Sequence, residues 1–514
     1  MNRGHPVGEE KRCWYVHCRF SGITNGVVMA DQSLRVALIS EHASPLAQQG
    51  SVDAGGQNVY VQHVAAALAR RGHHVDVLTR RDQRHLPTAV DMRPGVRVLH
   101  IDAGPPSFVP KEQLMPYMKA FGTEALRLMR RSLPYDVVHA NFFMSGVVGL
   151  RLQRQLQLPL MQTFHALGAV RQLHQREADA FPPERLLLER RIACEADCVI
   201  AECPQDAHDL VTHYGAPPGR IAQVPCGVDL EEFGPGDRRS ARRRLGLPDD
   251  EFIVLQLGRL VPRKGIDNVI RAVGRLDRST PWRLLVVGGD TVVPDDVRTP
   301  EIGRLRRVAQ EEGCEPWVQF VGRRDREQLR DYYLAADVFV TTPWYEPFGI
   351  TPLEAMACGT PVIGAEVGGI QHTVVDGLTG YLVPPKDPES LALRLQDLRS
   401  HPELARMMGR AGLARVQREF TWDSVAEKLS QVYTRVARQR RMRAAETSLR
   451  LMSHSGASAG AGAALIPTDQ LAAARALQER RTTADLAVRG EPAPTELTQV
   501  AAMAEMPRQW LGAK

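Results

Sequence analysis

The sequence predicts an α/β protein with two doubly wound parallel-sheet domains in tandem. Strand-like apolar runs alternate with helical patterns from Leu34 onward, which is typical of parallel sheets covered by helices on both faces. The polar stretch 234–250 separates two such runs, and 514 residues are enough for two buried cores. Ligands of doubly wound sheets bind beyond the carboxyl ends of the strands, so we expect the functional residues there, in a cleft between the domains.

The strands can be placed from their apolar runs and from the helical patterns between them. In the first domain, 34–225, we expect strands at 35–40, 74–79, 96–101, 136–140, 158–164 and 198–201, with helices that include 58–71 and 111–132. In the second domain, 226–419, we expect strands at 252–257, 283–287, 318–321, 338–342 and 361–364.

Both ends of the chain differ in character from the two domains. Residues 1–33 lack clean periodicity, so we predict a poorly ordered extension and hypothesise that translation starts at Met29; detection of peptides from 1–28 would refute this. An amphipathic helix is predicted at 420–444. The Ala/Gly/Ser-rich tail 445–514 is predicted to lack a stable core, with a helical pattern only at 468–481.

The composition is that of a soluble globular protein, with 43% hydrophobic and 24% charged residues. A net charge of +6 suits an anionic substrate and does not indicate nucleic-acid binding. The sequence shows neither a run of about 20 apolar residues nor a signal peptide, so we expect a cytoplasmic enzyme. Cys194, Cys198 and Cys203 cluster without metal-ligand pairing, which favours free thiols over zinc or disulfides.

Two glutamates eight residues apart, Glu346 and Glu354, follow the strand predicted at 338–342. Thr351 suits a helix N-cap and Pro352 the first helical position, which places Glu354 in the first turn. The helix start offers backbone N–H groups to an anion, and the carboxylates suit a polyhydroxyl ligand such as a sugar nucleotide. The alternative is a capping box in which Glu354 only bonds back to the helix start.

A second pattern, Arg259 and Lys264 with glycines on either side, follows the first strand of the second domain. A planar guanidinium and a compact ammonium together suit a diphosphate, because each binds phosphate oxygens in a different geometry. The alternative is a pair of solvated loop cations. The location at the same sheet edge as Glu346 favours the diphosphate site.

In the first domain, Gly55-Gly56-Gln57-Asn58 follows the first strand and opens a helix. It is not the Gly-x-Gly-x-x-Gly fingerprint of dinucleotide binding, which disfavours a nicotinamide oxidoreductase. The alternative to a ligand-binding loop is a structural Gly-Gly turn. His165 ends the fifth strand at the cleft-facing edge, where it is either a structural or a catalytic residue.

These segments together closely resemble the signature of family 4 retaining glycosyltransferases. The resemblance is carried by Glu-Pro-Phe-Gly at 346–349, the seven residues between the glutamates, Ala-Cys-Gly-Thr-Pro-Val at 357–362, and the Gly-Arg…Lys-Gly loop at 258–265. It continues through Gly368-Gly369 and Asp376-Gly377 to 380–384 and covers 34–440. It implies a GT-B fold of two Rossmann-like domains, with the helix at 420–444 returning to brace the first.

The resemblance also implies an activity and roles for single residues. The expected enzyme moves a hexosyl group from a nucleotide sugar, with a UDP-sugar as the expected donor, to a small hydroxylated acceptor, with retention of configuration and without metal or cofactor. The catalytic residues would be Glu346, His165, Arg259 and Lys264. The donor-binding residues would be Glu354, Gly349, Ile350, Thr351 and Gly56, and the acceptor-binding residues Gln57, Asn58, Lys111 and Arg185.

The acceptor is where the sequence leaves alternatives open. Within the family, the chain resembles sucrose-phosphate synthases and D-inositol-3-phosphate N-acetylglucosaminyltransferases. The segment 139–143 has phenylalanine where the latter group has a tyrosine, and Ala166 replaces a threonine. Transfer to a sugar phosphate, or an inactive sugar-nucleotide-binding scaffold, are therefore alternatives. Contact with a membrane surface stays open.

Overall fold

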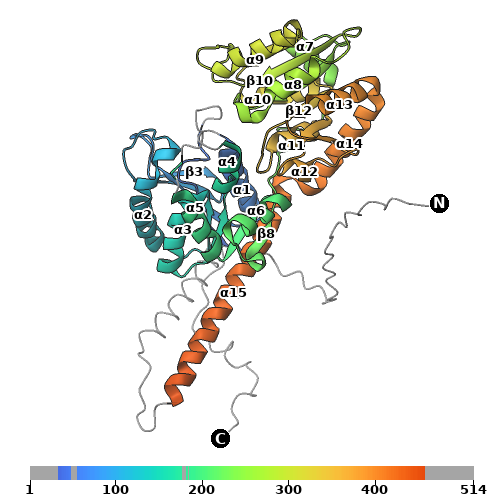
Figure 1. Ribbon diagram of the computed structural model, residues 1–514. Helices are drawn as coiled ribbons and strands as arrows, with labels where there is room; N and C mark the ends of the chain where they lie inside the picture. Colours follow the sequence, from blue (N-terminus) through green and yellow to red (C-terminus); the bar gives the residue numbers. More distant parts are fainter. Residues whose placement is uncertain (1–32, 48–54, 176–180, 183, 458–514) are drawn as a thin grey trace, which may run out of the picture. The chain divides into compact units, whose positions relative to one another are not determined.

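The computed structural model describes residues 33–47, 55–175, 181–182 and 184–457 (Figure 1). The chain forms two compact units, Met1–Arg441 and Met442–Lys514. Both sheets belong to the first unit, and the described part of the second is the end of the last helix, 442–457. The predictions for Met29, for the extension before residue 33 and for a helix at 468–481 fall outside the described residues.

The first sheet has eight strands in the order β3-β4-β2-β1-β5-β6-β7-β8, all parallel except β3, which is antiparallel to β4. Its strands are β1 (Arg35–Ile39), β2 (His74–Arg80), β3 (Ala89–Arg93), β4 (Val96–Ile101), β5 (Val137–Asn141), β6 (Leu160–Thr163), β7 (Cys198–Ala201) and β8 (Ile221–Gln223). Its helices are α1 (Gly56–Arg70), α2 (Met118–Arg131), α3 (Phe143–Leu156), α4 (Gly168–Gln175), α5 (Glu184–Glu195) and α6 (Pro204–Tyr214), with short 3-10 helices η1 (Lys111–Gln113), η2 (Met115–Tyr117) and η4 (Pro218–Arg220).

The second sheet has six parallel strands in the order β11-β10-β9-β12-β13-β14. Its strands are β9 (Phe252–Leu257), β10 (Trp282–Val287), β11 (Val318–Gly322), β12 (Val338–Thr341), β13 (Val362–Ala365) and β14 (Gly380–Val383). Its helices are α7 (Arg238–Leu245), α8 (Ile266–Val273), α9 (Pro300–Glu311), α10 (Arg326–Ala335), α11 (Ile350–Ala357), α12 (Ile370–Thr373), α13 (Pro388–Ser400) and α14 (Pro402–Glu419), with η5 (Pro262–Lys264) and η6 (Glu315–Trp317).

The predicted fold class is confirmed, and three predicted strands coincide with β4, β7 and β9. The strands β3, β8 and β14 were not predicted. The exposed side chains that alternate along β3 mark it as an edge strand without the apolar run that reveals a buried one. The helix predicted at 111–132 is wrong at its start, because Pro116 lacks the N–H group that a continuous helix needs. The α-helix begins only at Met118.

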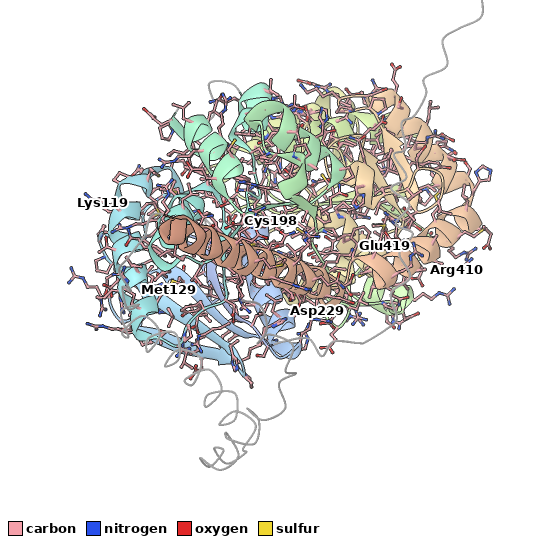
Figure 2. The ribbon with its side chains drawn as sticks, turned by 90° about the horizontal axis from the view of Figure 1, so that it is seen from below. Lys119, Met129, Cys198, Asp229, Arg410 and Glu419 are labelled. Atoms are coloured by element: carbon pink, nitrogen blue, oxygen red, sulfur yellow. The ribbon has the colours of Figure 1, made fainter. Side chains whose placement is uncertain are left out.

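The predicted amphipathic helix at 420–444 is confirmed as the first part of α15 (Trp422–Ala457). Trp422, Val425, Leu429 and Tyr433 follow the 3.6-residue period and are all buried. The Tyr433 hydroxyl lies 2.6 Å from His139 Nδ1 on β5, so the helix packs against the first sheet as predicted. Figure 2 shows Cys198 of β7 beside α15, where Arg435 approaches its thiol.

The cysteines that cluster in sequence, Cys194, Cys198 and Cys203, are free thiols, as predicted. Within the described ranges, no helix combines the length and the apolar character needed to cross a membrane.

Candidate active site

The loop after β9 carries the two cations that the sequence predicts to meet a diphosphate. Gly265 has a φ of +63°, and a Cβ there would lie 2.0 Å from the carbonyl oxygen of Thr342. Only glycine therefore lets the loop pack against the end of β12, which brings Lys264 to the segment that carries Glu346. The Arg259 side chain is exposed, and no described residue forms a hydrogen bond or ion pair with it.

Glu346 and Lys264 form an ion pair. The ammonium donates to Glu346 Oε2, and each side chain is 16% exposed. Burial lowers the pKa of Lys264. Burial also opposes ionisation of Glu346, but Lys264 and Arg263 together hold the pKa of that carboxyl below its ordinary value. The pair thus presents a carboxylate for hydroxyl groups and an ammonium for phosphate at one point.

The predicted Gly368-Gly369 motif supports the backbone of Glu346. The Gly369 N–H donates to the Glu346 carbonyl oxygen at 3.1 Å. A Cβ on Gly368, whose φ is +46°, would lie 1.9 Å from the same oxygen. Because these glycines leave no room for a side chain, the loop after β13 lies directly against the loop after β12.

Helix α11 begins earlier than the sequence predicts. Gly349 is its N-cap, with a φ of +90°, and Ile350 and Thr351 are its first two residues. The predictions that Thr351 is the N-cap and Pro352 the first helical residue are therefore wrong. The chain turns through a positive φ that favours glycine, so the cap forms without a side-chain oxygen. The predicted donor-binding residues 349–351 still form the positive end of the helix.

The capping-box interpretation of Glu354 is also wrong. Glu354 is 3% exposed, and its Oε1 accepts a hydrogen bond from Arg326 Nη1 at 2.9 Å. Its Oε2 accepts one from the Tyr333 hydroxyl at 2.8 Å. Arg326 Nε also lies 2.5 Å from Glu232, on the segment between the two sheets. Two donors fix the Glu354 carboxylate, and its role toward a ribose stays a prediction.

The glycine loop of the first sheet caps α1. Gly55 is the N-cap and Gly56 the first helical residue. A Cβ on Gly56 would lie 3.6 Å from Ile350 Cδ1, so this loop approaches the start of α11. Gly56 and Ile350, two predicted donor-binding residues that begin helices of different domains, therefore lie together.

The two amides after Gly56 differ in their contacts. Gln57 is half-buried, and its Nε2 donates to Ser40 Oγ at 3.1 Å. Asn58 is buried, its Oδ1 accepts from the Gly55 N–H at 3.1 Å, and its Nδ2 donates to the Ser44 carbonyl oxygen at 3.0 Å. Asn58 thus serves the helix cap, and this geometry gives no support to its predicted acceptor role.

His165 follows β6 at the carboxyl edge of the first sheet, with a φ of +59°. Its Nδ1 lies 3.1 Å from Glu202 Oε1, and its Nε2 lies 3.0 Å from Asn141 Oδ1. The Tyr60 ring packs edge-on against the imidazole, with ring centroids 4.7 Å apart. The ring is therefore held by the ends of both neighbouring strands, β5 and β7.

The turn that carries Glu202 also contacts the loop of Glu346. Cys203 Sγ donates to the Pro347 carbonyl oxygen at 3.5 Å. Asp206 Oδ2 accepts from the Glu202 N–H at 3.0 Å, and burial together with the Glu202 charge raises the pKa of Asp206 to about 8. One turn after β7 therefore contacts both His165 and the loop that follows β12.

Arg185, for which the sequence predicts an acceptor contact, is buried. Its side chain is 2% exposed, its Nε pairs with Glu189 at 2.7 Å, and its Nη2 donates to the Ala166 carbonyl oxygen at 2.6 Å. Three aromatic rings surround the guanidinium: Phe142, Phe143 and Phe181. Arg185 thus stabilises the turn after His165, and its predicted contact with an acceptor stays untested.

Lys111 opens η1 and is half-buried. The helix predicted to start at this residue starts at Met118, so Lys111 lies on the connection between β4 and α2. Its predicted contact with an acceptor phosphate stays a prediction.

A cavity of about 280 Å³ lies beside Glu346. Helices α4 and α6 line one side, and segments 344–347 and 367–368 line the other. The His174 and Tyr345 rings, which both line this cavity, stack on each other with centroids 5.0 Å apart. A substrate group bound next to Glu346 has space here.

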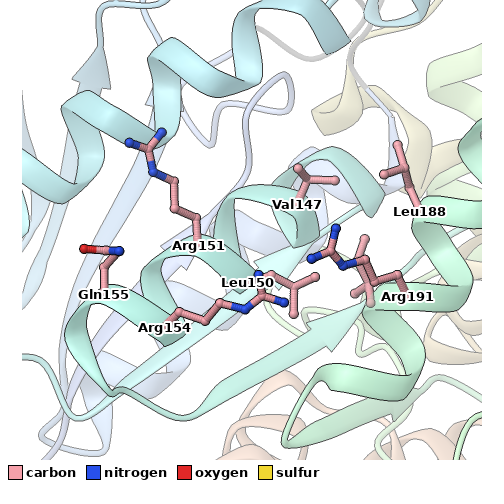
Figure 3. Close-up of a pocket in the computed structure, with 8 residues that line it drawn as sticks. Val147, Leu150, Arg151, Arg154, Gln155, Leu188 and Arg191 are labelled. Carbon is pink, nitrogen blue, oxygen red and sulfur yellow. The ribbon is translucent and has the colours of Figure 1, made fainter.

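A second hollow, of about 260 Å³, lies between α3 and α5 (Figure 3). Arg151, Arg154 and Arg191 surround an apolar floor, but these cations already have partners. Arg154 and Arg191 both pair with Glu195, and Arg151 donates to the Lys119 carbonyl oxygen. We assign no ligand to this hollow.

The hydrogen-bond partners of the predicted site residues were not predicted from the sequence. Glu202 and Asn141 bind His165, while Arg326 and Tyr333 bind Glu354. Asn141 and Glu202 lie at the carboxyl ends of strands, so their positions could have marked them. Arg326 and Tyr333 lie on α10, 28 and 21 residues before Glu354 in sequence, and no local pattern joins them to it.

Comparison with known sequences identifies both halves of the chain. Residues 54–232 match the family described as Glycosyltransferase Family 4, and residues 237–415 match Glycosyl transferases group 1. A D-inositol 3-phosphate glycosyltransferase 2 of Catenulispora acidiphila is 39% identical over 409 residues, which is 78% of this chain and 95% of that protein. One from Nocardia farcinica is 38% identical over 453 residues, or 87% and 96%.

Among solved structures, a sucrose-phosphate synthase from Thermosynechococcus elongatus is 37% identical, with a TM-score of 0.71 over 78% of this chain and 99% of that one. Anabaena HepE, solved with UDP and glucose, has a TM-score of 0.60 over 78% of this chain and 99% of its own, at 20% identity, which shows a shared fold. The two parallel sheets and these matches place the chain in the family 4 glycosyltransferases, with the GT-B fold.

Proposed function

We propose that this glycosyltransferase moves a hexosyl group from a UDP-sugar to a small phosphorylated acceptor, with retention of configuration and without a metal ion. The observation that carries the proposal is the meeting of Lys264, Glu346 and the start of α11 at one sheet edge. The diphosphate of a nucleotide sugar would bind Lys264 and the start of α11, and its sugar hydroxyls would bind the Glu346 carboxylate.

In the proposed reaction, the acceptor oxygen bonds to the anomeric carbon on the face from which the nucleoside diphosphate leaves. The acceptor's proton passes to the departing phosphate oxygen, so no protein base is needed. Arg259 and Lys264 neutralise the charge that grows on the leaving group, which is the task of a metal ion in other transferases.

A phosphorylated acceptor is supported by the names of the relatives, which are inositol phosphate glycosyltransferases and a sucrose-phosphate synthase. The segment 139–143, with phenylalanine in place of a tyrosine, and Ala166 lack the hydroxyls that the resemblance leads us to expect for an inositol phosphate. These two residues favour a sugar phosphate as the second candidate acceptor.

The first test is thermal stabilisation of the purified chain by UDP, GDP, ADP and NAD, and by their sugar forms, in the presence of a chelator. We expect selective stabilisation by UDP and UDP-sugars. Transfer to D-inositol 3-phosphate and to hexose phosphates is then measured, with the anomeric configuration of the product read by NMR. Stabilisation by none of the nucleotides, in folded protein, contradicts the proposal and favours a scaffold role.

A further inference from the structure

Both ring nitrogens of His165 face hydrogen-bond acceptors. Glu202 Oε1 lies 3.1 Å from Nδ1, and Asn141 Oδ1 lies 3.0 Å from Nε2. A neutral imidazole carries one N–H and therefore satisfies only one of two such acceptors. The protonation of this ring thus depends on whether both partners are true acceptors.

The amide of Asn141 is oriented by its other contacts. Its Nδ2 donates to the carbonyl oxygens of Ile39 at 3.3 Å and of His139 at 3.4 Å. Asn141 is fully buried, so water cannot replace these bonds. Turning the amide over would place Oδ1 against two carbonyl oxygens, which repel it. Asn141 therefore presents its oxygen to His165.

Glu202 is an acceptor as well. Burial opposes its ionisation, but contacts with His165 and with the Cys226 thiol hold the pKa of the Glu202 carboxyl below its ordinary value. The Cys226 Sγ lies 3.0 Å from the same Oε1 that faces His165. A carboxyl group is a stronger acid than an imidazolium, so a proton shared across the 3.1 Å contact between Glu202 and His165 resides on the ring. Both partners of the imidazole therefore require a donor.

We propose that Glu202 is a positioning residue for glycosyl transfer, which keeps His165 in the doubly protonated form and fixes its ring. This inference rests on the proposed function. A ring with protons on both nitrogens donates to Glu202 and Asn141 and carries positive charge near the transferred sugar and the departing diphosphate. Since it has no free lone pair, it cannot take the acceptor's proton, which leaves the phosphate oxygen as the base.

The test is ¹⁵N NMR of histidine-labelled full-length protein at neutral pH, with the His165 signals assigned by their loss in His165→Gln. In the wild type we expect both ring nitrogens to show the protonated signature. In Glu202→Gln, whose amide keeps the size of the side chain, we expect a neutral ring. Turnover should fall about 10-fold or more, while stabilisation by UDP changes little.

Cys226→Ala is the matched control, because it removes the other contact of the same carboxylate oxygen. It should keep the doubly protonated ring and near wild-type turnover. A neutral His165 ring in the wild type overturns the inference, and so does Glu202→Gln with unchanged turnover. Apart from the His165→Gln protein used for assignment, the wild-type NMR result needs neither a folded variant nor activity. A doubly protonated ring in a protein without transferase activity therefore contradicts the proposed function and leaves this inference standing.

Discussion

The substitution Glu354→Gln separates ligand binding from structural support at the second glutamate. The side chain is 3% exposed and both carboxylate oxygens accept hydrogen bonds, from Arg326 and Tyr333. Glutamine keeps one acceptor oxygen for Arg326, and its NH₂ group can donate to the Tyr333 hydroxyl, which rotates to accept. The substitution therefore removes charge without leaving a cavity.

The expected effects differ between folding and binding. The bond to Arg326 changes from an ion pair to a bond with one charged partner, which should lower the free energy of unfolding by roughly 1–2 kcal/mol. If Glu354 also accepts a ribose hydroxyl, UDP binding should weaken by about 1–3 kcal/mol, or roughly 5- to 150-fold.

Calorimetric titration with UDP and thermal unfolding measure the two effects on the same samples. Glu232→Gln is the matched control, because it neutralises the other carboxylate of Arg326, 2.5 Å from Nε, and leaves Glu354 intact. The control should lose stability and keep its affinity for UDP. If Glu354→Gln loses stability like the control and binds UDP like the wild type, Glu354 supports the structure and does not bind the nucleotide.

Three further substitutions test other contacts. Lys264→Met should lower turnover about 100-fold or more and UDP affinity by less, because leaving-group charge develops in the transition state; steady-state kinetics and titration measure this. Asp206→Asn should stabilise the fold relative to the wild type, and this gain should grow from pH 4 to 8. The pKa of Asp206 is raised from 3.8 to about 8 in the folded protein, so the wild type loses stability as the pH rises through this range. Unfolding measured across pH should show the difference in unfolding free energy change by about 1.4 kcal/mol per pH unit. Tyr433→Phe should cost about 1–3 kcal/mol of unfolding free energy, because His139 loses its partner on α15.

Controls for these substitutions come from exposed positions. Lys119→Met on α2 removes a lysine of the same kind and should leave turnover unchanged. Gln431→Ala on α15 should leave stability within about 0.5 kcal/mol of wild type. Equal turnover of Lys264→Met and wild type contradicts the leaving-group role, and a flat pH dependence of the Asp206→Asn difference contradicts a half-buried, protonated Asp206.

The fold was predictable because its strands are buried on both faces and read as continuous apolar runs. β9 is an example, with five of its six residues buried and its bounds predicted correctly. The edge strand β3 alternates exposed and half-buried residues, and its sequence lacks this pattern. Helix starts were less predictable. Pro116 interrupts the helix predicted at 111–132, and Gly349 caps α11 through its positive φ although Thr351 nearby is a more usual type of cap residue.

The site was predictable where its residues lie on loops directly after strands. Lys264 and Glu346 are distant in sequence, yet both follow neighbouring strands, β9 and β12, and form an ion pair. Burial of Arg185 was not predictable, because a basic helical residue among polar neighbours is usually exposed. Only the fold brings Phe142, Phe143 and Phe181 around it.

Each residue with a predicted role at the reacting centre, except the exposed Arg259, is already paired with another protein group. Lys264 holds Glu346, Glu202 holds His165, and Arg326 holds Glu354. Removing one member leaves its partner charged and partly buried, which costs free energy without any ligand present. A loss of activity in a single variant therefore does not by itself identify a ligand contact. Only the non-additive part of a double-mutant cycle, measured with and without nucleotide, separates the two contributions.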